Sequence, residues 1–307
     1  MVTEKSILIK NWIARFNAAF HFLINPLSLS LSLGQKVYDY LSVVVVTKDE
    51  GPYIVEWIEF HKLVGVDRFY IYDAATDNTR ELLKPYIESG EVVYFEALEK
   101  GCQNQCYNHF LSHYRNRSRW VAIIDADEFI VPVGKYNTIP ELLHEFESYP
   151  AIGVNWILYD SNNHVTKPEG LVIENYTQVH ADFCSANLII KSIVNPRKTI
   201  CSLSPHECLF FPLSSKRHAV TENFEKIPGG GRAPSISTEK IRINHYYSKS
   251  LEEYKLKISR GMADSLQCSP IRMEAVCFDD PIQDDSSLRF VESVRKGIRE
   301  YEFRQIR

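Results

Sequence analysis

The chain has 307 residues, a formal net charge of −4, and aromatic residues at 12% of its positions. This length allows one α/β domain with a large core and short extensions, and the slightly acidic balance argues against a nucleic-acid-binding protein, which needs a basic face. The seven cysteines include no Cys-x-x-Cys pair. We therefore expect free thiols in a reducing, cytoplasmic compartment rather than a disulfide framework or a zinc site.

Residues 1–40 differ in character from the rest of the chain. Between residues 5 and 25, apolar side chains recur at helical spacing with basic residues between them. The segment is too interrupted to span a bilayer and lacks a signal-peptide cleavage site. We predict an amphipathic helical extension and leave two interpretations open: a helix lying peripherally at the inner face of the membrane, or a helix packed on the protein's own surface.

Strands and helices alternate along the next hundred residues. Residues 41–46 contain four consecutive valines, which are typical of a buried strand. Helical periodicity, short apolar runs and polar turns then follow one another, which is the pattern of βαβ units. The sequence therefore predicts an α/β fold with a mixed, mainly parallel sheet flanked by helices. The expected strands are 41–46, 67–72, 91–95 and 120–124, and the expected helices are 53–64, a segment from about residue 80, and 103–114.

Two carboxylates one residue apart, Asp125 and Asp127, follow the apolar run of the last of these strands. Ligands of open α/β sheets bind beyond the carboxyl ends of the strands, and two such carboxylates suit Mg²⁺ or Mn²⁺ bridged to a substrate phosphate. An Asp-x-Asp sequence also occurs in turns and helix caps. Its position directly after a buried strand favours the metal site.

A set of short segments resembles the motifs of glycosyltransferases with the GT-A fold, most closely the family 92 and family 2-like group. The resemblance covers residues 41 to 261. It departs from the family pattern at Ala74 and Ala75 and at residues 159–162. The second departure implies that this chain recognises its acceptor differently from its relatives. We divide the chain into an N-terminal extension (1–40), a GT-A glycosyltransferase domain (41–265) and a C-terminal helical tail (266–307). The matching segments, in order, are 47–50, 56–61, 72–73, 77–78, 125–129, 191–196, 244–246, 249–254 and 257–261.

The resemblance implies a Mn²⁺ or Mg²⁺ ion at the two aspartates. Asp127 would be the direct metal ligand, and Asp125 would contact the metal through water or bind the donor ribose. His245 would be a third metal ligand. The alternative for His245 is a hydrogen-bonded core residue.

The resemblance also implies a donor site for a UDP-sugar. Thr47, Glu50 and Asp73 would contact its base and ribose, although Thr47 and Asp73 are also common cap and turn residues. Gln103 is a donor contact, whereas Tyr107 is expected to pack in the core. Lys249, Lys257 and Arg260 would close over the diphosphate, with a solvated helix face as the alternative, most of all for Lys257.

An inverting sugar transfer needs a base for the acceptor hydroxyl. Glu207 is the candidate, with Asp160 and Glu169 as rivals. Trp156 and Tyr159 are candidates for stacking on the acceptor sugar, unless they belong to the core.

The expected activity is a metal-dependent, inverting transfer of a hexose from a UDP-sugar to a glycan or lipid-linked glycan, and galactose is the sugar that the resemblance implies. A nucleotidyltransferase would need a Gly-rich basic loop after the first strand, where residues 47–50 are acidic instead. A non-catalytic glycan- or nucleotide-binding module on the same scaffold is the alternative from another functional class.

Overall fold

The computed structural model describes residues 39–97, 102–180, 185–212, 216–260 and 276–305. The predicted N-terminal helix and the end of the predicted glycosyltransferase domain lie outside these ranges. Asp39 and Tyr40, which the sequence assigns to the extension, already belong to the first strand. Within the described ranges, no helix has the length and apolar character needed to cross a bilayer.

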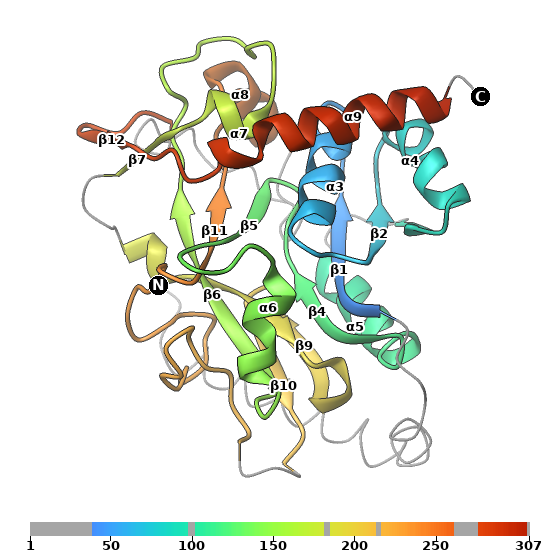
Figure 1. Ribbon diagram of the computed structural model, residues 1–307, viewed down its shortest axis with the longest axis vertical. Helices are drawn as coiled ribbons and strands as arrows, with labels where there is room; N and C mark the ends of the chain where they lie inside the picture. Colours follow the sequence, from blue (N-terminus) through green and yellow to red (C-terminus); the bar gives the residue numbers. More distant parts are fainter. Residues whose placement is uncertain (1–38, 98–101, 181–184, 213–215, 261–275, 306–307) are drawn as a thin grey trace.

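An eight-stranded mixed sheet forms the centre of the molecule (Figure 1). Strands β8 and β5 run antiparallel to their neighbours, and the other strands share one direction. This arrangement confirms the predicted α/β class with a mainly parallel sheet. The strand order is β3 (Val92–Glu96), β2 (Arg68–Asp73), β1 (Asp39–Thr47), β4 (Ser118–Ile123), β8 (Ile190–Val194), β6 (Ala151–Leu158), β11 (Ile241–His245) and β5 (Glu128–Pro132).

Helices cover both faces of the sheet, which explains the run of four valines in β1. Val43 and Val45 pack in one hydrophobic cluster with α3 (Ile54–Leu63) and α4 (Thr79–Glu88). Val44, which points to the other face, packs with α5 (Gln103–His113). Because successive side chains of a strand alternate between faces, a strand covered on both sides must be apolar throughout.

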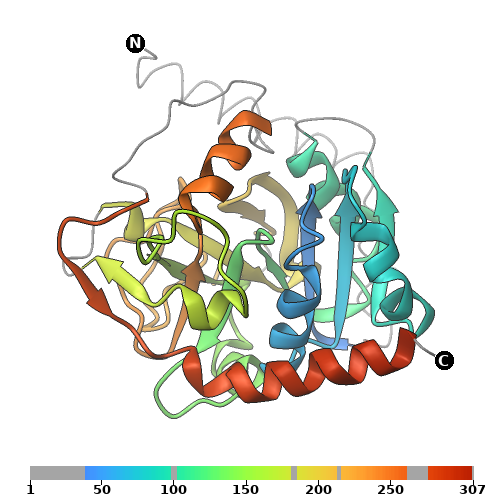
Figure 2. The ribbon, with the colours of Figure 1, turned by 90° about the horizontal axis from the view of Figure 1, so that it is seen from above.

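Helix α9 (Val291–Gln305) lies across α3 and α4 (Figures 1 and 2). The Tyr301 ring stacks on Tyr86 with centroids 5.0 Å apart, and its hydroxyl donates to the Leu82 carbonyl (2.9 Å). Gly297 approaches α3 so closely that a Cβ there would lie 2.5 Å from the Glu59 carboxylate. The described part of the C-terminal tail is therefore tightly packed against the sheet domain.

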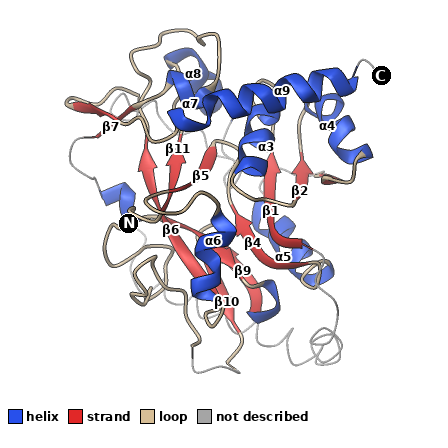
Figure 3. Cartoon of the chain, in the orientation of Figure 1, coloured by secondary structure: helices blue, strands red, loops and turns tan. Residues whose placement is uncertain are grey.

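The remaining elements lie around the sheet and its helices (Figure 1). Residues 211–240, between β10 and β11, contain no helix or strand in their described part (Figure 3). These elements are α6 (Ile139–Leu143), η1 (His144–Phe146), α7 (Val172–Asn175), β7 (Gln178–His180), η2 (Ser185–Leu188), η3 (Pro196–Lys198), β9 (Thr199–Ser204), β10 (Glu207–Phe210), α8 (Leu251–Arg260), β12 (Pro281–Gln283) and η5 (Leu288–Phe290).

Candidate active site

The ends of β1, β2 and β3 hold a polar cluster around Asp73. The register aligns Thr47 with Asp73, and Asp73 with Glu96, so the three strands end level. The Asp73 carboxylate accepts hydrogen bonds from the Thr47 hydroxyl (2.8 Å), the Tyr94 hydroxyl (3.2 Å) and the backbone N–H of Ala75 (3.1 Å). Thr47 and Asp73 are the last residues of their strands and not helix caps, and the bond from Ala75 shows that Asp73 also forms a turn, as the alternative predicted.

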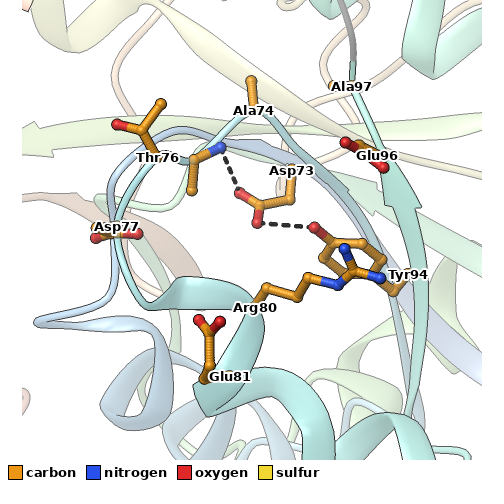
Figure 4. Close-up of a pocket in the computed structure, with 10 residues that line it drawn as sticks. Asp73, Ala74, Thr76, Asp77, Arg80, Glu81, Tyr94, Glu96 and Ala97 are labelled. Atoms are coloured by element: carbon orange, nitrogen blue, oxygen red, sulfur yellow. Dashed lines mark hydrogen bonds between the residues drawn. The ribbon is translucent and has the colours of Figure 1, made fainter.

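A cavity of about 350 Å³ opens beside this carboxylate (Figure 4). Its wall includes Asp77, Arg80 and Glu96, and the Arg80 guanidinium lies over the Tyr94 ring, 5.5 Å from its centroid. Burial raises the pKa of Asp73, and this effect is larger than that of the hydrogen bonds that the carboxylate accepts, which lower the pKa. A hollow of this kind offers carboxylate acceptors and an aromatic wall to a small polar ligand.

Asp125 follows β4 at the same edge of the sheet. Gln103, at the first turn of α5, donates from its amide to Asp125 Oδ1 (2.6 Å). The Tyr107 hydroxyl, which accepts from the Gln103 amide (3.0 Å), lies 3.5 Å from the same oxygen. Tyr107 is fully buried, so it both packs in the core, as predicted, and contacts the site.

Lys191 also belongs to the site, although the sequence predicts no role for it. Its ammonium, fully buried in β8, lies 2.7 Å from Asp125 Oδ2 and 3.7 Å from the Glu128 carboxylate. Burial opposes its charge, but the Asp125 and Glu128 carboxylates outweigh burial and raise the pKa of Lys191. In the sequence Lys191 begins a segment that resembles the family motifs, and the structure places it in a five-residue strand in which every residue is buried.

Asp127 faces a histidine and a lysine from distant parts of the chain. His245 Nε2 lies 3.5 Å from Asp127 Oδ1, and Lys257 Nζ lies 2.5 Å from Oδ2. Burial opposes ionisation of Asp127, but the Lys257 ammonium lowers its pKa well below the usual value. Burial lowers the pKa of His245, which keeps its imidazole neutral. The alternative of a solvated helix face for Lys257 is wrong.

A divalent cation would find a partial set of ligands here. Asp127 and the neutral imidazole of His245 face each other, whereas the Asp125 oxygens are contacted by Gln103 and Lys191. Among the described residues, no three His, Cys, Asp or Glu side chains form a group that could hold a metal. Two protein ligands are still compatible with Mg²⁺ or Mn²⁺, because such ions take substrate phosphates and water as further ligands.

The remaining predicted donor residues are Glu50, between β1 and α3, Lys249, just before α8, and Arg260, in α8. The Lys249 ammonium is 3.9 Å from the Glu50 carboxylate and lies over the Tyr53 ring, 4.1 Å from its centroid. The Glu50 backbone carbonyl accepts the N–H groups of Tyr53 and Ile54 at the start of α3. Arg260 is the last residue of α8, and its side chain lies outside the described part of the structure.

The proposed bases occupy different surroundings. Both Asp160 oxygens accept backbone N–H groups, from Asn162 (2.8 Å) and Phe278 (3.3 Å), which gives this carboxylate a role in holding two loops together. Glu207 is the first residue of β10 rather than part of a loop, and Glu169 is exposed.

The two candidate stacking residues also differ. Tyr159 lies in the core against Tyr246, with ring centroids 4.7 Å apart. Trp156 contacts His245, with centroids 4.4 Å apart, and Lys191 lies over its ring, 5.8 Å from the centroid. Trp156 is thus part of the candidate site.

Comparison with known proteins identifies the family of this chain. The model of glycosyltransferase family 92 matches residues 47–227, which is more than half of the sequence. The chain belongs to glycosyltransferase family 92. The resemblance found in the sequence is thereby confirmed. The matched residues of this family 92 chain include Thr47, Asp73, Asp125, Asp127 and Lys191.

Two relatives match this family 92 chain over much of its length. Glycosyltransferase family 92 protein At1g27200 of Arabidopsis thaliana is 24% identical over 73% of this chain and 38% of the relative. Beta-1,4-galactosyltransferase galt-1 of Caenorhabditis elegans is 22% identical over 69% of this chain and 49% of the relative. The chain thus spans less than half of the length of these curated relatives.

Solved structures share only a general likeness with the chain. S. aureus TarS 1–349 in complex with UDP has a TM-score of 0.35 and 16% identity, covering 51% of this chain and 47% of that chain. The mannosyltransferase Ktr4p from S. cerevisiae in complex with GDP has a TM-score of 0.25 and 10% identity, covering 52% of each chain.

Proposed function

We propose that the chain transfers a hexose, with galactose as the first candidate, from a UDP-sugar to a hydroxyl of a glycan or lipid-linked glycan. The observation that carries the proposal is the alignment of the Asp73 cavity, Asp125 and Asp127 along one edge of the sheet in a family 92 chain. The name of the galactosyltransferase relative supports galactose.

The spacing of the strands suits a nucleoside diphosphate. Strand β1 lies between β2, which ends at Asp73, and β4, which leads into Asp125. Neighbouring strands are about 4.8 Å apart, so the two carboxylates would be roughly 10 Å apart across the edge. A nucleoside in the Asp73 cavity would then place its diphosphate near Asp125 and Asp127.

Three lysines supply positive charge for that diphosphate. Lys191 lies against Asp125, Lys257 against Asp127, and Lys249 near Glu50. Lysine binds phosphate as a point charge, and these ammonium groups would oppose the negative charge that develops on the departing UDP. A divalent cation held by Asp127 and His245 would add Lewis-acid assistance to the same leaving group.

The proposal is tested by incubating the protein with a panel of UDP-sugars and Mn²⁺ and measuring UDP release. Asp127→Asn should reduce release at least a hundredfold without lowering the melting temperature by more than a few degrees. The exposed Asp280 offers a matched control, because Asp280→Asn removes the same charge outside the site. UDP binding without turnover would instead support a non-catalytic nucleotide-binding module, and full activity of Asp127→Asn would contradict the assignment of the site.

A further inference from the structure

The turn between β9 and β10 brings His206 to the candidate site. Its imidazole packs edge-on against Trp156, with ring centroids 5.1 Å apart and an interplanar angle of 80°. Trp156 also contacts His245, which faces Asp127. Two histidines from distant segments therefore contact one indole next to the aspartates.

A backbone hydrogen bond sets the tautomer of His206. Its Nδ1 lies 3.0 Å from the carbonyl oxygen of Ile190. A carbonyl oxygen can only accept, so Nδ1 carries the proton and Nε2 presents a lone pair. No hydrogen bond joins Nε2 to another residue within the described ranges. Burial and the nearby Lys191 lower the pKa of His206 to about 4, so the ring is neutral at physiological pH.

The same strand links His206 to Asp125. Ile190, whose carbonyl holds the imidazole, precedes Lys191, whose ammonium holds Asp125 at 2.7 Å. Lys191, Asp125 and His245 are the ionisable groups that act on His206 electrostatically. The imidazole is thus positioned relative to Asp125 through two consecutive residues of β8.

Gly231 fixes the other side of the His206 turn. Its φ of +70° is in the left-handed region, and a Cβ at this position would lie 2.4 Å from the His206 Cβ. The Gly231 carbonyl also accepts the N–H of Ile190 (3.0 Å). Close packing of this kind holds a functional side chain in one orientation.

The indole beside His206 has an unused donor. Trp156 Nε1 is buried and makes no hydrogen bond within the described part of the chain. A buried N–H without an acceptor is costly, and a sugar hydroxyl bound beside the ring would supply one. Aromatic rings also pack against the apolar faces of other rings.

We propose, on the basis of the function proposed above, that His206 is the group that deprotonates the acceptor hydroxyl, with Trp156 as the surface on which the acceptor sugar lies. The hydroxyl transfers its proton to His206 Nε2, and its oxygen forms a bond to the anomeric carbon of the donor hexose. The bond from that carbon to the diphosphate oxygen breaks, and its electron pair leaves with UDP. The imidazolium then releases its proton to water. This role replaces Glu207, the next residue in the chain, as the base.

The sharpest variant is His206→Asn. The Asn amide can still donate to the Ile190 carbonyl, but it offers no basic nitrogen in place of Nε2. With UDP-galactose as donor and a panel of p-nitrophenyl β-hexosides as acceptors, kcat for transfer should fall about a hundredfold, the lower end of the usual contribution of a general base. The Kd for UDP should stay within twofold of the wild-type value. Added imidazole should restore part of the transfer rate, which a purely structural role of His206 would not allow.

His113→Asn is the matched control. His113 Nδ1 also contacts a backbone carbonyl, that of His109 (3.0 Å), but its ring is exposed at the end of α5. This variant should transfer at the wild-type rate. Gly231→Ala is a second test that leaves His206 in the chain, and it should lower kcat by displacing the His206 turn.

The outcomes separate this inference from the function on which it rests. A wild-type protein that releases no UDP from any donor contradicts both. Wild-type transfer by a folded His206→Asn variant contradicts the inference and leaves the proposed function standing. A slow variant that imidazole does not restore, with weakened UDP binding, also contradicts the assignment of a base.

Discussion

Lys257 and Asp127 are 130 residues apart in the chain, yet the Lys257 ammonium lies 2.5 Å from the Asp127 carboxylate. The pair fastens α8 over the segment between β4 and β5, and Lys257 also donates to the Tyr247 carbonyl (2.9 Å). A helix from a late part of the sequence is thereby held against the centre of the candidate site.

Removal of the Lys257 charge should destabilise the fold. Lys257→Met leaves Asp127 largely buried, and the loss of one partner of a buried ion pair costs several kcal/mol. Because the two side chains are still 22% and 12% exposed, we expect a loss of about 2 kcal/mol in the free energy of unfolding, measured in urea. Lys255→Met, on the exposed side of α8, should change it by less than about 0.5 kcal/mol.

Lys191→Met should lower the free energy of unfolding more than Lys257→Met does. It leaves the Asp125 and Glu128 carboxylates together without their ammonium, and Lys191 and Glu128 are fully buried. We expect a loss of roughly 3 kcal/mol in urea unfolding. Burial raises the pKa of Glu128 well above its usual value, so the second change Glu128→Gln should recover part of this loss. If the loss in the free energy of unfolding of the double variant equals the sum of the losses of the two single variants, the two groups do not interact.

Asp73→Asn tests the cavity beside β2. The Asn carbonyl can still accept from the Thr47 hydroxyl, so the fold should keep its melting temperature. Loss of the carboxylate as a hydrogen-bond acceptor should weaken UDP binding about tenfold, or 1.4 kcal/mol, measured by calorimetry. Equal affinities of the variant and the wild-type protein would place the nucleoside elsewhere.

His245→Ala tests the interaction with a divalent cation. We expect UDP binding in the presence of Mn²⁺ to weaken at least tenfold, which corresponds to about 1.4 kcal/mol, with little loss of stability without metal. A variant that binds UDP and Mn²⁺ normally but melts early would make His245 a structural residue.

Glu56 should make stability depend on pH. Burial raises the pKa of Glu56 to about 7. Its carboxylate accepts hydrogen bonds from the backbone N–H groups of Val172 and Ile173, which lower the pKa, but burial has the larger effect. A carboxyl whose pKa is raised on folding stabilises the protein below its unfolded pKa of about 4.5, and this stability is lost as pH rises through about 7. The loss should be roughly 3 kcal/mol, at 1.36 kcal/mol per pKa unit.

Urea unfolding at pH 5 and pH 8 measures this difference. Glu56→Gln should make it smaller, because an amide does not titrate. Some difference should remain, since burial also raises the pKa of Glu253 to about 7. Glu88→Gln, at an exposed helical position, should leave the full difference in place.

The sequence predicts the first half of the fold closely. The expected helices 53–64 and 103–114 correspond to Ile54–Leu63 and Gln103–His113, because periodicity reports which face of an element is buried. The sequence predicts both Gln103 and Asp125 as donor-site residues, and the structure places the Gln103 amide nitrogen 2.6 Å from an Asp125 carboxylate oxygen.

The second half depends on long-range contacts that no local pattern contains. Lys191 begins a segment that resembles the family motifs, but the sequence does not predict its contacts, and a histidine in a turn, such as His206, is common. Their roles arise from packing against Asp125 and Trp156. Asp160 is a candidate base from its place in the chain, but in the structure its carboxylate oxygens accept hydrogen bonds from backbone N–H groups.

The position of β11 has a consequence for biosynthesis. Strand β5 hydrogen-bonds to β11, its one neighbour in the described sheet, and all five of its residues are buried. About 110 residues lie between the ends of β5 and β11, and at roughly 5–20 residues per second the ribosome needs on the order of ten seconds to make them. During that interval β5 is an unpaired, largely apolar strand, the kind of edge that promotes aggregation. A nascent chain halted before residue 241 would therefore need chaperone protection.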